Sequence, residues 1–327
     1  MSNPEVMKFE EFISKIIRGD IRSISRGLTL IESGSELSEV IVDGISANCG
    51  RAHRIGITGP PGAGKSTLTN LIAKQFSSQN KKVGIIAVDP SSPFSGGALL
   101  GDRVRMSEVG MDPNVFIRSL ATRGSMGGLS VKARDAADLL DAAGYDVIIY
   151  ETVGVGQSEL DIVKAADSVV VILVPESGDS VQAMKSGLME IADIFVLNKG
   201  DRPGAEQAMS NIRSMLMMKF EHAVKWEIPV LKTIASEAYG ITKLCDSLTA
   251  HYEYLLSTNK LYSNRAKYFN ERVEEIVRNK ILENIMDSSG YFHNRSENSN
   301  DESVPTLSPY QAAINLIEKI KNSLTQK

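Results

Sequence analysis

The chain of 327 residues carries 36 lysines and arginines against 40 aspartates and glutamates, a formal net charge of -4. Its 42% of hydrophobic and 23% of charged residues are typical of a folded globular chain, which excludes a wholly disordered or fibrous protein. The mildly acidic balance argues against a nucleic-acid-binding surface. The lack of a signal-peptide pattern and of an apolar run of roughly 20 residues favours a cytoplasmic protein without a membrane span.

The N-terminal segment, residues 1–48, is predicted to be helical. Ile21, Ile24, Leu28 and Ile31 follow one another at spacings of three and four residues, which places them on one face of a helix. We expect this apolar stripe to pack on the main domain.

The main domain, residues 49–255, alternates short apolar runs with helical stretches. Six runs are predicted to be strands, namely HRIGITG, KVGIIAVD, YDVIIYET, SVVVILVP, DIFVLNK and EIPVLKTI. Because they are apolar nearly throughout, they favour an α/β fold with a doubly wound, mostly parallel sheet flanked by helices. Two Gly- and Ser-rich stretches, residues 89–106 and 122–130, are expected to be ligand loops at the carboxyl ends of strands.

A phosphate-binding loop follows the first predicted strand. The residues GPPGAGKS, from Gly59 to Ser66, match the pattern GxxxxGK[ST] between a strand and a helix. In such a loop the glycines turn backbone N–H groups toward the phosphates, Lys65 reaches the β- and γ-phosphates, and the Ser66 hydroxyl binds Mg²⁺. The sequence therefore predicts a P-loop NTPase.

A second motif, Asn198-Lys199-Gly200-Asp201, ends the predicted strand DIFVLNK. A carboxylate at the position of Asp201 can accept hydrogen bonds from N1–H and the 2-amino group of guanine. Adenine has neither donor, and a site built for such donors rejects analogues that lack them. With Lys199 lying along the base, the motif predicts GTP as the nucleotide.

Carboxylates near the predicted phosphate site are candidates for holding Mg²⁺. Glu151 follows the strand DVIIY in a Walker-B-like position, and the N–H of Gly154 could sense the γ-phosphate. Asp89 and Asp102 are further candidates. Because Mg²⁺ usually takes only one or two protein carboxylates, the sequence leaves open which of the three bind it directly, and turn or surface roles stay open for Asp89 and Asp102.

The C-terminal segment, residues 256–327, is predicted to be helical apart from a polar tract over residues 288–308. A last helix is predicted to begin with Ser308 as its cap and Pro309 in its first turn. The longer helix before the tract has an apolar face that consists of Phe269, Val273, Ile276, Val277, Ile281, Ile285 and Met286.

Together these motifs resemble the MeaB/ArgK family of P-loop GTPases, which includes the methylmalonic aciduria type A proteins. The resemblance spans nearly the whole chain and includes GDIRSISRGLTLIES, GITGPPGAGKSTL, VDPSSPFSGGALLGDRVRM, RGSMGGLS, ETVGVGQSE, VPESGDSVQAMKSGLMEIAD and SPYQAA. It implies a GTPase chaperone of an adenosylcobalamin-dependent acyl-CoA mutase, typically methylmalonyl-CoA mutase, that gates cofactor loading and protects the enzyme. It also implies a homodimer formed through the C-terminal extension, which would explain the apolar face that begins at Phe269, although a core within one chain would give the same pattern.

The resemblance and the motifs together give a set of expected site residues. The segment from Glu176 to Lys185 resembles a switch loop, with Asp179 and Gln182 at matching positions, and Ile234-Ala235 replaces a Ser-Ala pair whose backbone meets the guanine oxygen. The expected catalytic residues are Lys65, Asp102, Glu151 and Gln157; the metal ligands are Ser66, Asp89, Asp102 and Glu151; and the nucleotide contacts are Gly59, Pro60, Pro61, Gly62, Ala63, Gly64, Lys65, Ser66, Thr67, Gly154, Asn198, Lys199, Asp201 and Ala235.

Two other functions stay open from the sequence. A P-loop kinase linked to amino-acid transport would transfer the phosphoryl group to an acceptor, but it would rarely need the guanine-reading motif. A nickel-inserting GTPase would need a Cys/His cluster, whereas the four histidines His53, His222, His251 and His293 are scattered. Because Pro60 and Pro61 stand where some dimeric relatives of this class carry an extra lysine, we expect slow hydrolysis that a partner accelerates.

Overall fold

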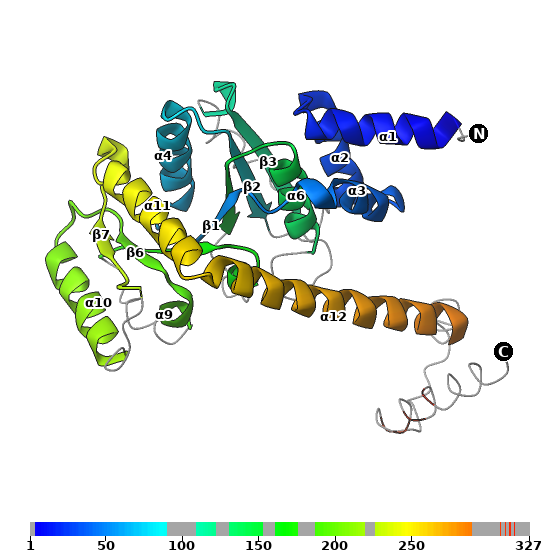
Figure 1. The fold of residues 1–327 in the computed structure, drawn as a ribbon. Helices are drawn as coiled ribbons and strands as arrows, with labels where there is room; N and C mark the ends of the chain where they lie inside the picture. Colours follow the sequence, from blue (N-terminus) through cyan, green and yellow to red (C-terminus); the bar gives the residue numbers. More distant parts are fainter. Residues whose placement is uncertain are drawn as a thin grey trace, which may run out of the picture. The chain divides into compact units, whose positions relative to one another are not determined.

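The computed structural model describes residues 4–89, 109–121, 131–152, 161–175, 187–219 and 226–289, together with Ser308, Gln311, Ile314 and Ile317. The chain divides into two compact units, Met1–Tyr262 and Ser263–Lys327. The first unit contains both the N-terminal helices and the sheet (Figure 1). The division of the chain into residues 1–48, 49–255 and 256–327 stays a prediction.

A parallel sheet of seven strands forms the centre of the first unit, in the order β3-β2-β4-β1-β5-β6-β7. This confirms the predicted doubly wound α/β fold. The strands are β1 His53–Thr58, β2 Val83–Asp89, β3 Val115–Ala121, β4 Val147–Thr152, β5 Ser168–Leu173, β6 Ile194–Leu197 and β7 Val230–Lys232.

The edge strand β3 is one more strand than the sequence analysis predicted. Its run VFIRSLA is interrupted by Arg118 and Ser119 and was not recognised as a strand. In the structure the Arg118 guanidinium pairs with Glu32 and donates to Thr29, both on α2 (Ile21–Ser33). Arg118 lies in register with Ile86 of β2, whose side chain enters the core shared with the N-terminal helices, so a carboxylate on α2 can pair with its charge.

Alternate residues of four strands, β2, β4, β5 and β6, enter two separate cores, one on each face of the sheet. In β2, Val83 and Ile85 belong to one core, whereas Ile86 and Val88 belong to the other. The same alternation holds in β4, β5 and β6. Because both faces are covered, nearly every position of a central strand must be apolar, which explains the continuous apolar runs of the sequence.

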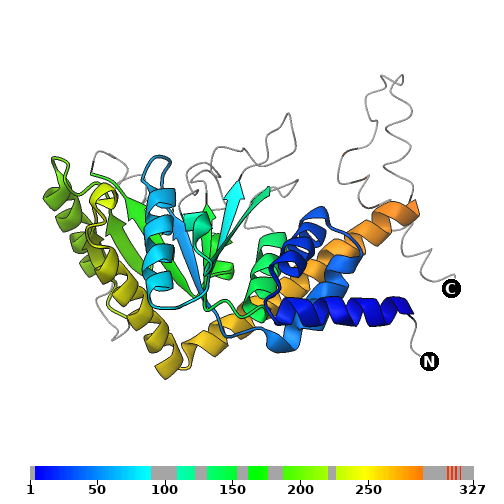
Figure 2. The ribbon, with the colours of Figure 1, turned by 90° about the horizontal axis from the view of Figure 1, so that it is seen from above.

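Helices cover both faces of the sheet. Helices α4 (Lys65–Ser78) and α11 (Ile241–Ser257) pack on one core, and Figure 2 shows α4 on one side of the strands and α6 (Val131–Ala142) on the other. Alongside α6, the second core contains residues of α9 (Leu188–Ile191) and α10 (Ala205–Lys219) and of the N-terminal helices. Short 3₁₀ turns complete the connections at η1 Ser46–Asn48, η2 Val109–Met111, η3 Ile162–Lys164 and η4 Ala235–Glu237.

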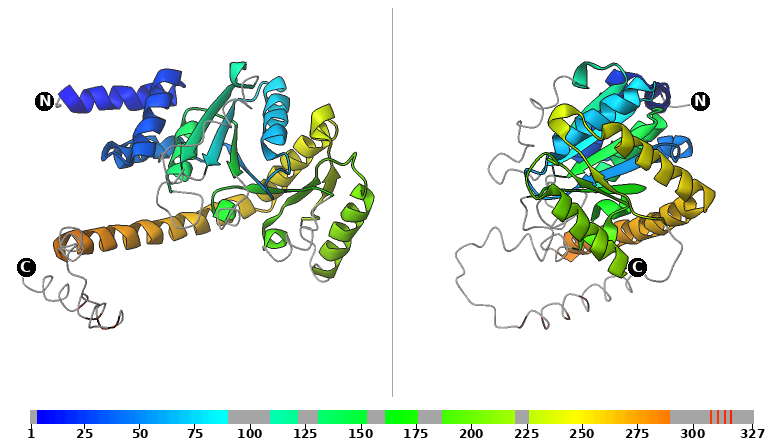
Figure 3. Two further views of the ribbon diagram at one scale, coloured as in Figure 1. Left: turned by 180° about the vertical axis from the view of Figure 1, so that it is seen from behind. Right: turned by 90° about the vertical axis from the view of Figure 1, so that its left-hand side faces the viewer.

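The N-terminal helices α1 (Pro4–Ile17), α2 and α3 (Leu37–Ile45) pack together, and α2 and α3 contact α6 (Figure 3). Of the predicted stripe on α2, Ile24, Leu28 and Ile31 are fully buried. The prediction was wrong for Ile21, which is 60% exposed. Asp20 caps α2 by accepting the N–H of Ser23 at 2.8 Å, so Ile21 begins the helix and the stripe starts one turn later.

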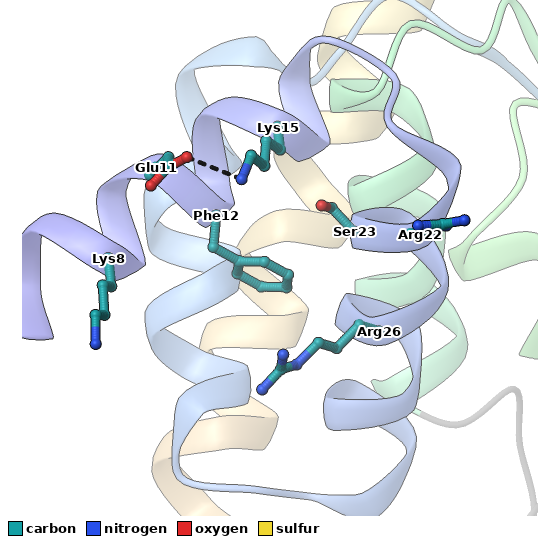
Figure 4. A pocket seen from close by; sticks show the side chains of 7 residues that line it. All are labelled: Lys8, Glu11, Phe12, Lys15, Arg22, Ser23 and Arg26. Atoms are coloured by element: carbon teal, nitrogen blue, oxygen red, sulfur yellow. Dashed lines mark ion pairs between the residues drawn. The ribbon is translucent and has the colours of Figure 1, made fainter.

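A basic hollow of about 310 Å³ lies between α1 and α2 (Figure 4). Three of its charged residues contact other lining residues. Lys15 pairs with Glu11 at 2.8 Å, and the Arg26 guanidinium lies 6.0 Å from the centre of the Phe12 ring. The hollow is lined by Lys8, Glu11, Phe12, Lys15, Arg22, Ser23 and Arg26, so it involves no residue of the predicted nucleotide site.

A buried polar chain lies at the amino ends of β1, β5 and β6. The Ser168 hydroxyl lies 2.7 Å from His53 Nε2 and 2.8 Å from His251 Nδ1, and His251 Nε2 lies 3.5 Å from Asp193. Burial raises the pKa of Asp193 to about 7 and lowers that of His251 to about 4. These directions favour a neutral contact with the proton on Asp193, rather than an ion pair.

Helix α12, Lys260–Ser289, carries the predicted apolar face into the second unit. Phe269, Val273, Val277 and Ile281 are each at least 43% exposed there. Beyond it, the N–H of Gln311 donates to the Ser308 hydroxyl at 3.2 Å, which confirms Ser308 as a helix cap. Among the described residues, no helix is long and apolar enough to cross a membrane.

Candidate nucleotide site

The phosphate-binding loop connects β1 to α4, as the sequence predicts. Gly59 has φ +140°, and a Cβ there would collide with the backbone carbonyl of Ile172 on the adjacent strand β5. Gly64 has φ +90°, and a Cβ there would collide with the side-chain amide of Asn198. The loop therefore needs glycine at both positions, for backbone conformation and for space.

Lys65 is the first residue of α4 and lies folded over the loop. Its ammonium donates to the carbonyl oxygens of Gly59 at 2.8 Å and Pro60 at 3.0 Å, and the residue is only 7% exposed. The preceding Gly64 provides no capping side chain, so no side chain at that position occupies the N–H groups of the first helical turn. A helix N-terminus with a lysine above it is an arrangement suited to binding phosphate.

Oxygen ligands suited to a divalent cation lie beside the loop. The Ser66 hydroxyl donates to Glu151 Oε1, and Glu151 is buried near the end of β4, paired in register with Ile57 of β1. Asp89 ends β2, the strand on the other side of β4, although its side chain is outside the described residues. A hydroxyl and a carboxylate at the phosphate loop are the hard oxygen donors that Mg²⁺ requires, so these residues fit that ion.

Asn198, which follows β6, connects three loops from a buried position. Its Nδ2 donates to the carbonyl of Ala63 in the phosphate loop at 2.8 Å. Its Oδ1 accepts the hydroxyl of Thr233 at 3.1 Å and the N–H of Ala235 at 3.2 Å, both from the loop after β7. The two donors fix the direction of the amide, because only its NH₂ group can then face Ala63.

The backbone after Asn198 is held in an uncommon conformation. Lys199 has φ +57°, a left-handed value that costs a residue with a Cβ roughly 1–2 kcal/mol. The N–H of Gly200 donates to Thr233 O at 3.0 Å and that of Arg202 to Lys199 O at 3.0 Å, which hold the turn in place. Asp201 is exposed at the tip of this turn. Strained turns that their surroundings hold in place are common at binding sites.

Comparison with known proteins assigns the family. The family model described as methylmalonyl Co-A mutase-associated GTPase MeaB matches residues 24–289. The chain belongs to the MeaB family of GTPases. A Pyrococcus horikoshii protein named as a GTPase is 44% identical over 313 residues, which are 95% of this chain and 98% of that protein.

Two further relatives cover most of this MeaB-family chain. The mouse methylmalonic aciduria type A homolog, a mitochondrial protein, is 30% identical over 348 aligned residues, covering 98% of this chain and 82% of that protein. The crystal structure of a LAO/AO transport system kinase has a TM-score of 0.71 and 28% identity, covering 98% of this chain and 99% of that one. The resemblance to the MeaB/ArgK family is thus confirmed, and the chain is a GTPase.

Several predicted residues of this MeaB-family GTPase lie outside the described residues. They are Asp102, Gly154 and Gln157, the loop over residues 122–130, and the segment over residues 176–185 with Asp179, Gln182 and Lys185. Among the described residues, Thr233 and Lys232 lie at this site without having been predicted to do so. Their type and spacing form no motif, and only the fold brings them to the loop after β6.

The N–H of Ala235 donates to Asn198 in the structure. Its predicted contact with the guanine oxygen stays a prediction. The neighbouring Ile234 and Tyr239 exchange two backbone hydrogen bonds of 3.2 Å each, which close the loop after β7 into a tight turn.

Proposed function

We propose that the chain binds GTP and Mg²⁺ at these loops and uses the cycle of binding and hydrolysis to assist an adenosylcobalamin-dependent acyl-CoA mutase. One observation carries the site assignment: Asn198 connects the phosphate loop directly to the loop that bears Asp201. A molecule that spans the two loops must combine phosphates with a planar base that offers hydrogen-bond donors. A guanine nucleotide has both groups.

Base recognition is assigned to Asp201 and Lys199. Asp201 is exposed at the end of a held turn, where its carboxylate is free to meet N1–H and the 2-amino group of guanine. Asp201→Asn replaces one acceptor by a donor, which suits the 2-oxo group of xanthine. The variant should therefore hydrolyse XTP in preference to GTP. Unchanged preference for GTP in this variant would remove Asp201 from the base site.

Phosphate binding is assigned to the loop from Gly59 to Thr67. The Lys65 ammonium would exchange its loop carbonyls for phosphate oxygens, and Ser66 with Glu151 would hold Mg²⁺. The ion would neutralise charge on the β- and γ-phosphates. Asp89 and Asp102 are proposed to complete the metal site, Gly154 to contact the γ-phosphate, and Gln157 or Asp102 to orient the attacking water.

The mutase as partner is supported by the description of the matching family model and by the relatedness to the methylmalonic aciduria type A homolog. The test is turnover of GTP and ATP, alone and with an adenosylcobalamin-dependent acyl-CoA mutase from the same organism. We expect GTP-selective turnover that the mutase raises. Lys65→Ala is the control, because loss of the ammonium should abolish turnover with or without the mutase.

Two outcomes of this assay would contradict the proposal. Equal GTP turnover with and without the mutase would remove the mutase as partner while leaving the GTPase intact. Transfer of labelled phosphate from ATP to an acceptor would favour the kinase function, which the name of the LAO/AO transport system kinase raises.

A homodimer is proposed through α12. Its exposed apolar residues include Val277 and Ile281, which are 50% and 53% exposed and one helical turn apart. Val277→Asp and Ile281→Asp should give monomers by analytical ultracentrifugation, whereas Asn279→Asp, on the other side of the helix, should not change the mass. A dimer that survives both aspartate substitutions at high salt would exclude this face as the interface.

A further inference from the structure

The side chain of Lys232 crosses the turn that bears the proposed guanine-reading residue. A Cβ built on Gly200 would lie 2.5 Å from Lys232 Cγ, 2.8 Å from Cε and 3.2 Å from Cδ, so the aliphatic stem lies directly against Gly200. Any larger residue at the third position of the NKGD motif would displace it. Glycine is therefore required at this position of the motif by Lys232, a residue 32 positions further along the chain.

The far end of the same side chain is anchored on the helix that follows the turn. The Lys232 ammonium lies 2.9 Å from Glu206 Oε1, in the first turn of α10. The hydrogen bond to Glu206 is the largest cause of the raised pKa of Lys232, with a smaller contribution from the charge of Asp201. One side chain thus extends from the end of β7, over Gly200, to the start of α10.

The turn needs such a restraint. Lys199 is in the left-handed conformation, and the next residue is Gly200. Glycine has more backbone freedom than any other residue type. A backbone hydrogen bond from Gly200 to Thr233 ties the turn to the residue after β7, and one from Arg202 to Lys199 closes the turn itself. The stem of Lys232 limits the movement of Gly200 toward the side that it covers.

We propose that the aliphatic stem of Lys232 is a positioning element for guanine recognition, because it packs against Gly200 and so sets the direction of the adjacent Asp201 carboxylate. Lys232 acts through Asp201 and does not itself read the base. The inference rests on the proposed function of Asp201.

The test compares the affinities of the full chain for GDP and for IDP, whose base lacks the 2-amino group. The ratio of the two dissociation constants reports the contact that Asp201 makes with that group. A purely structural defect would weaken both nucleotides equally and leave the ratio unchanged. Lys232→Ala removes stem and charge, Lys232→Met keeps most of the stem, and Lys74→Ala changes an exposed lysine on α4 as a control.

We expect Lys232→Ala to lower the preference for GDP over IDP by about fivefold, comparable to the loss of one hydrogen bond, while Lys232→Met and Lys74→Ala keep most of it. A ratio within twofold of wild type for Lys232→Ala would overturn the inference. So would an equal loss in Lys232→Met, because the stem would then not be the part that acts. If wild type itself does not distinguish GDP from IDP, or if Asp201→Ala does not abolish the distinction, the base assignment fails, and the inference fails with it.

Discussion

Replacing Asn198 by alanine should destabilise the protein even without nucleotide, because its amide holds three loops together. The substitution removes one hydrogen bond to Ala63 and two from Thr233 and Ala235. Asn198 and Thr233 are 2% and 0% exposed, so water cannot readily replace the lost partners. The variant therefore leaves a buried carbonyl and a buried hydroxyl without a partner.

The size of the effect follows from these two orphaned groups. A buried polar group left unsatisfied costs about 1–3 kcal/mol, so Asn198→Ala should lose about 2–6 kcal/mol of unfolding free energy. Thr233→Val removes only the hydroxyl at nearly constant shape and should cost about 1 kcal/mol, because Asn198 keeps Ala235 as a donor. Thr233→Ser keeps the hydroxyl and is the matched control.

The decisive measurement is the change in unfolding free energy that Thr233→Val causes when Asn198 is already replaced by alanine. With alanine at position 198 the Thr233 hydroxyl has lost the partner that it has in the wild type, so Thr233→Val in that background removes an orphaned group and should be neutral or stabilising. Urea unfolding followed through the fluorescence of Trp226, the only tryptophan of the chain, measures all four proteins of this cycle. If the two costs simply add, the hydroxyl does not interact with Asn198 and the proposed connection of the loops is refuted.

Two further predictions concern the buried polar chain at the amino ends of the strands and the phosphate loop. The pKa of Asp193 is raised to about 7, so its contribution to the unfolding free energy decreases as pH rises from about 4 to about 7. The pKa of His251 is lowered to about 4, so its contribution decreases as pH falls from about 6.5 to about 4. The two slopes oppose each other in wild type. Asp193→Asn should expose the histidine slope, seen as lower stability in urea at acid pH, and a flat profile in this variant would contradict it. Gly64→Ala should lower the unfolding free energy by about 1–3 kcal/mol more than Gly62→Ala, because both have positive φ but only position 64 meets Asn198, and equal melting temperatures would argue against that contact.

The strands could be predicted from the sequence where both faces of the sheet are covered by helices. Runs such as Val83–Asp89 and Val147–Thr152 are apolar at consecutive positions because alternate residues enter different cores. The edge strand β3 escaped prediction because Arg118 turns toward Glu32 on α2, a partner that lies 86 positions away in sequence. A charge inside a strand is intelligible only once its partner in space is known.

The candidate site divides in the same way. Lys65, Ser66 and Asn198 belong to contiguous motifs, so their spacing alone indicates the chemistry that we propose for them. Thr233 and Lys232 have no such pattern around them. They act on a turn that the sheet order brings next to β7, and that order is a property of long-range strand pairing.

The contacts of Asn198 also indicate how base and phosphate recognition could depend on each other. Its amide touches the phosphate loop at Ala63 and the base-side loop at Ala235, and both contacts are hydrogen bonds of a single rigid planar group. A shift of the turn that bears Asp201 cannot leave Ala63 unaffected unless one of these bonds breaks. A nucleotide with the wrong base should therefore lose more than its contact with Asp201, because the same amide helps to set the shape of the loop around its phosphates.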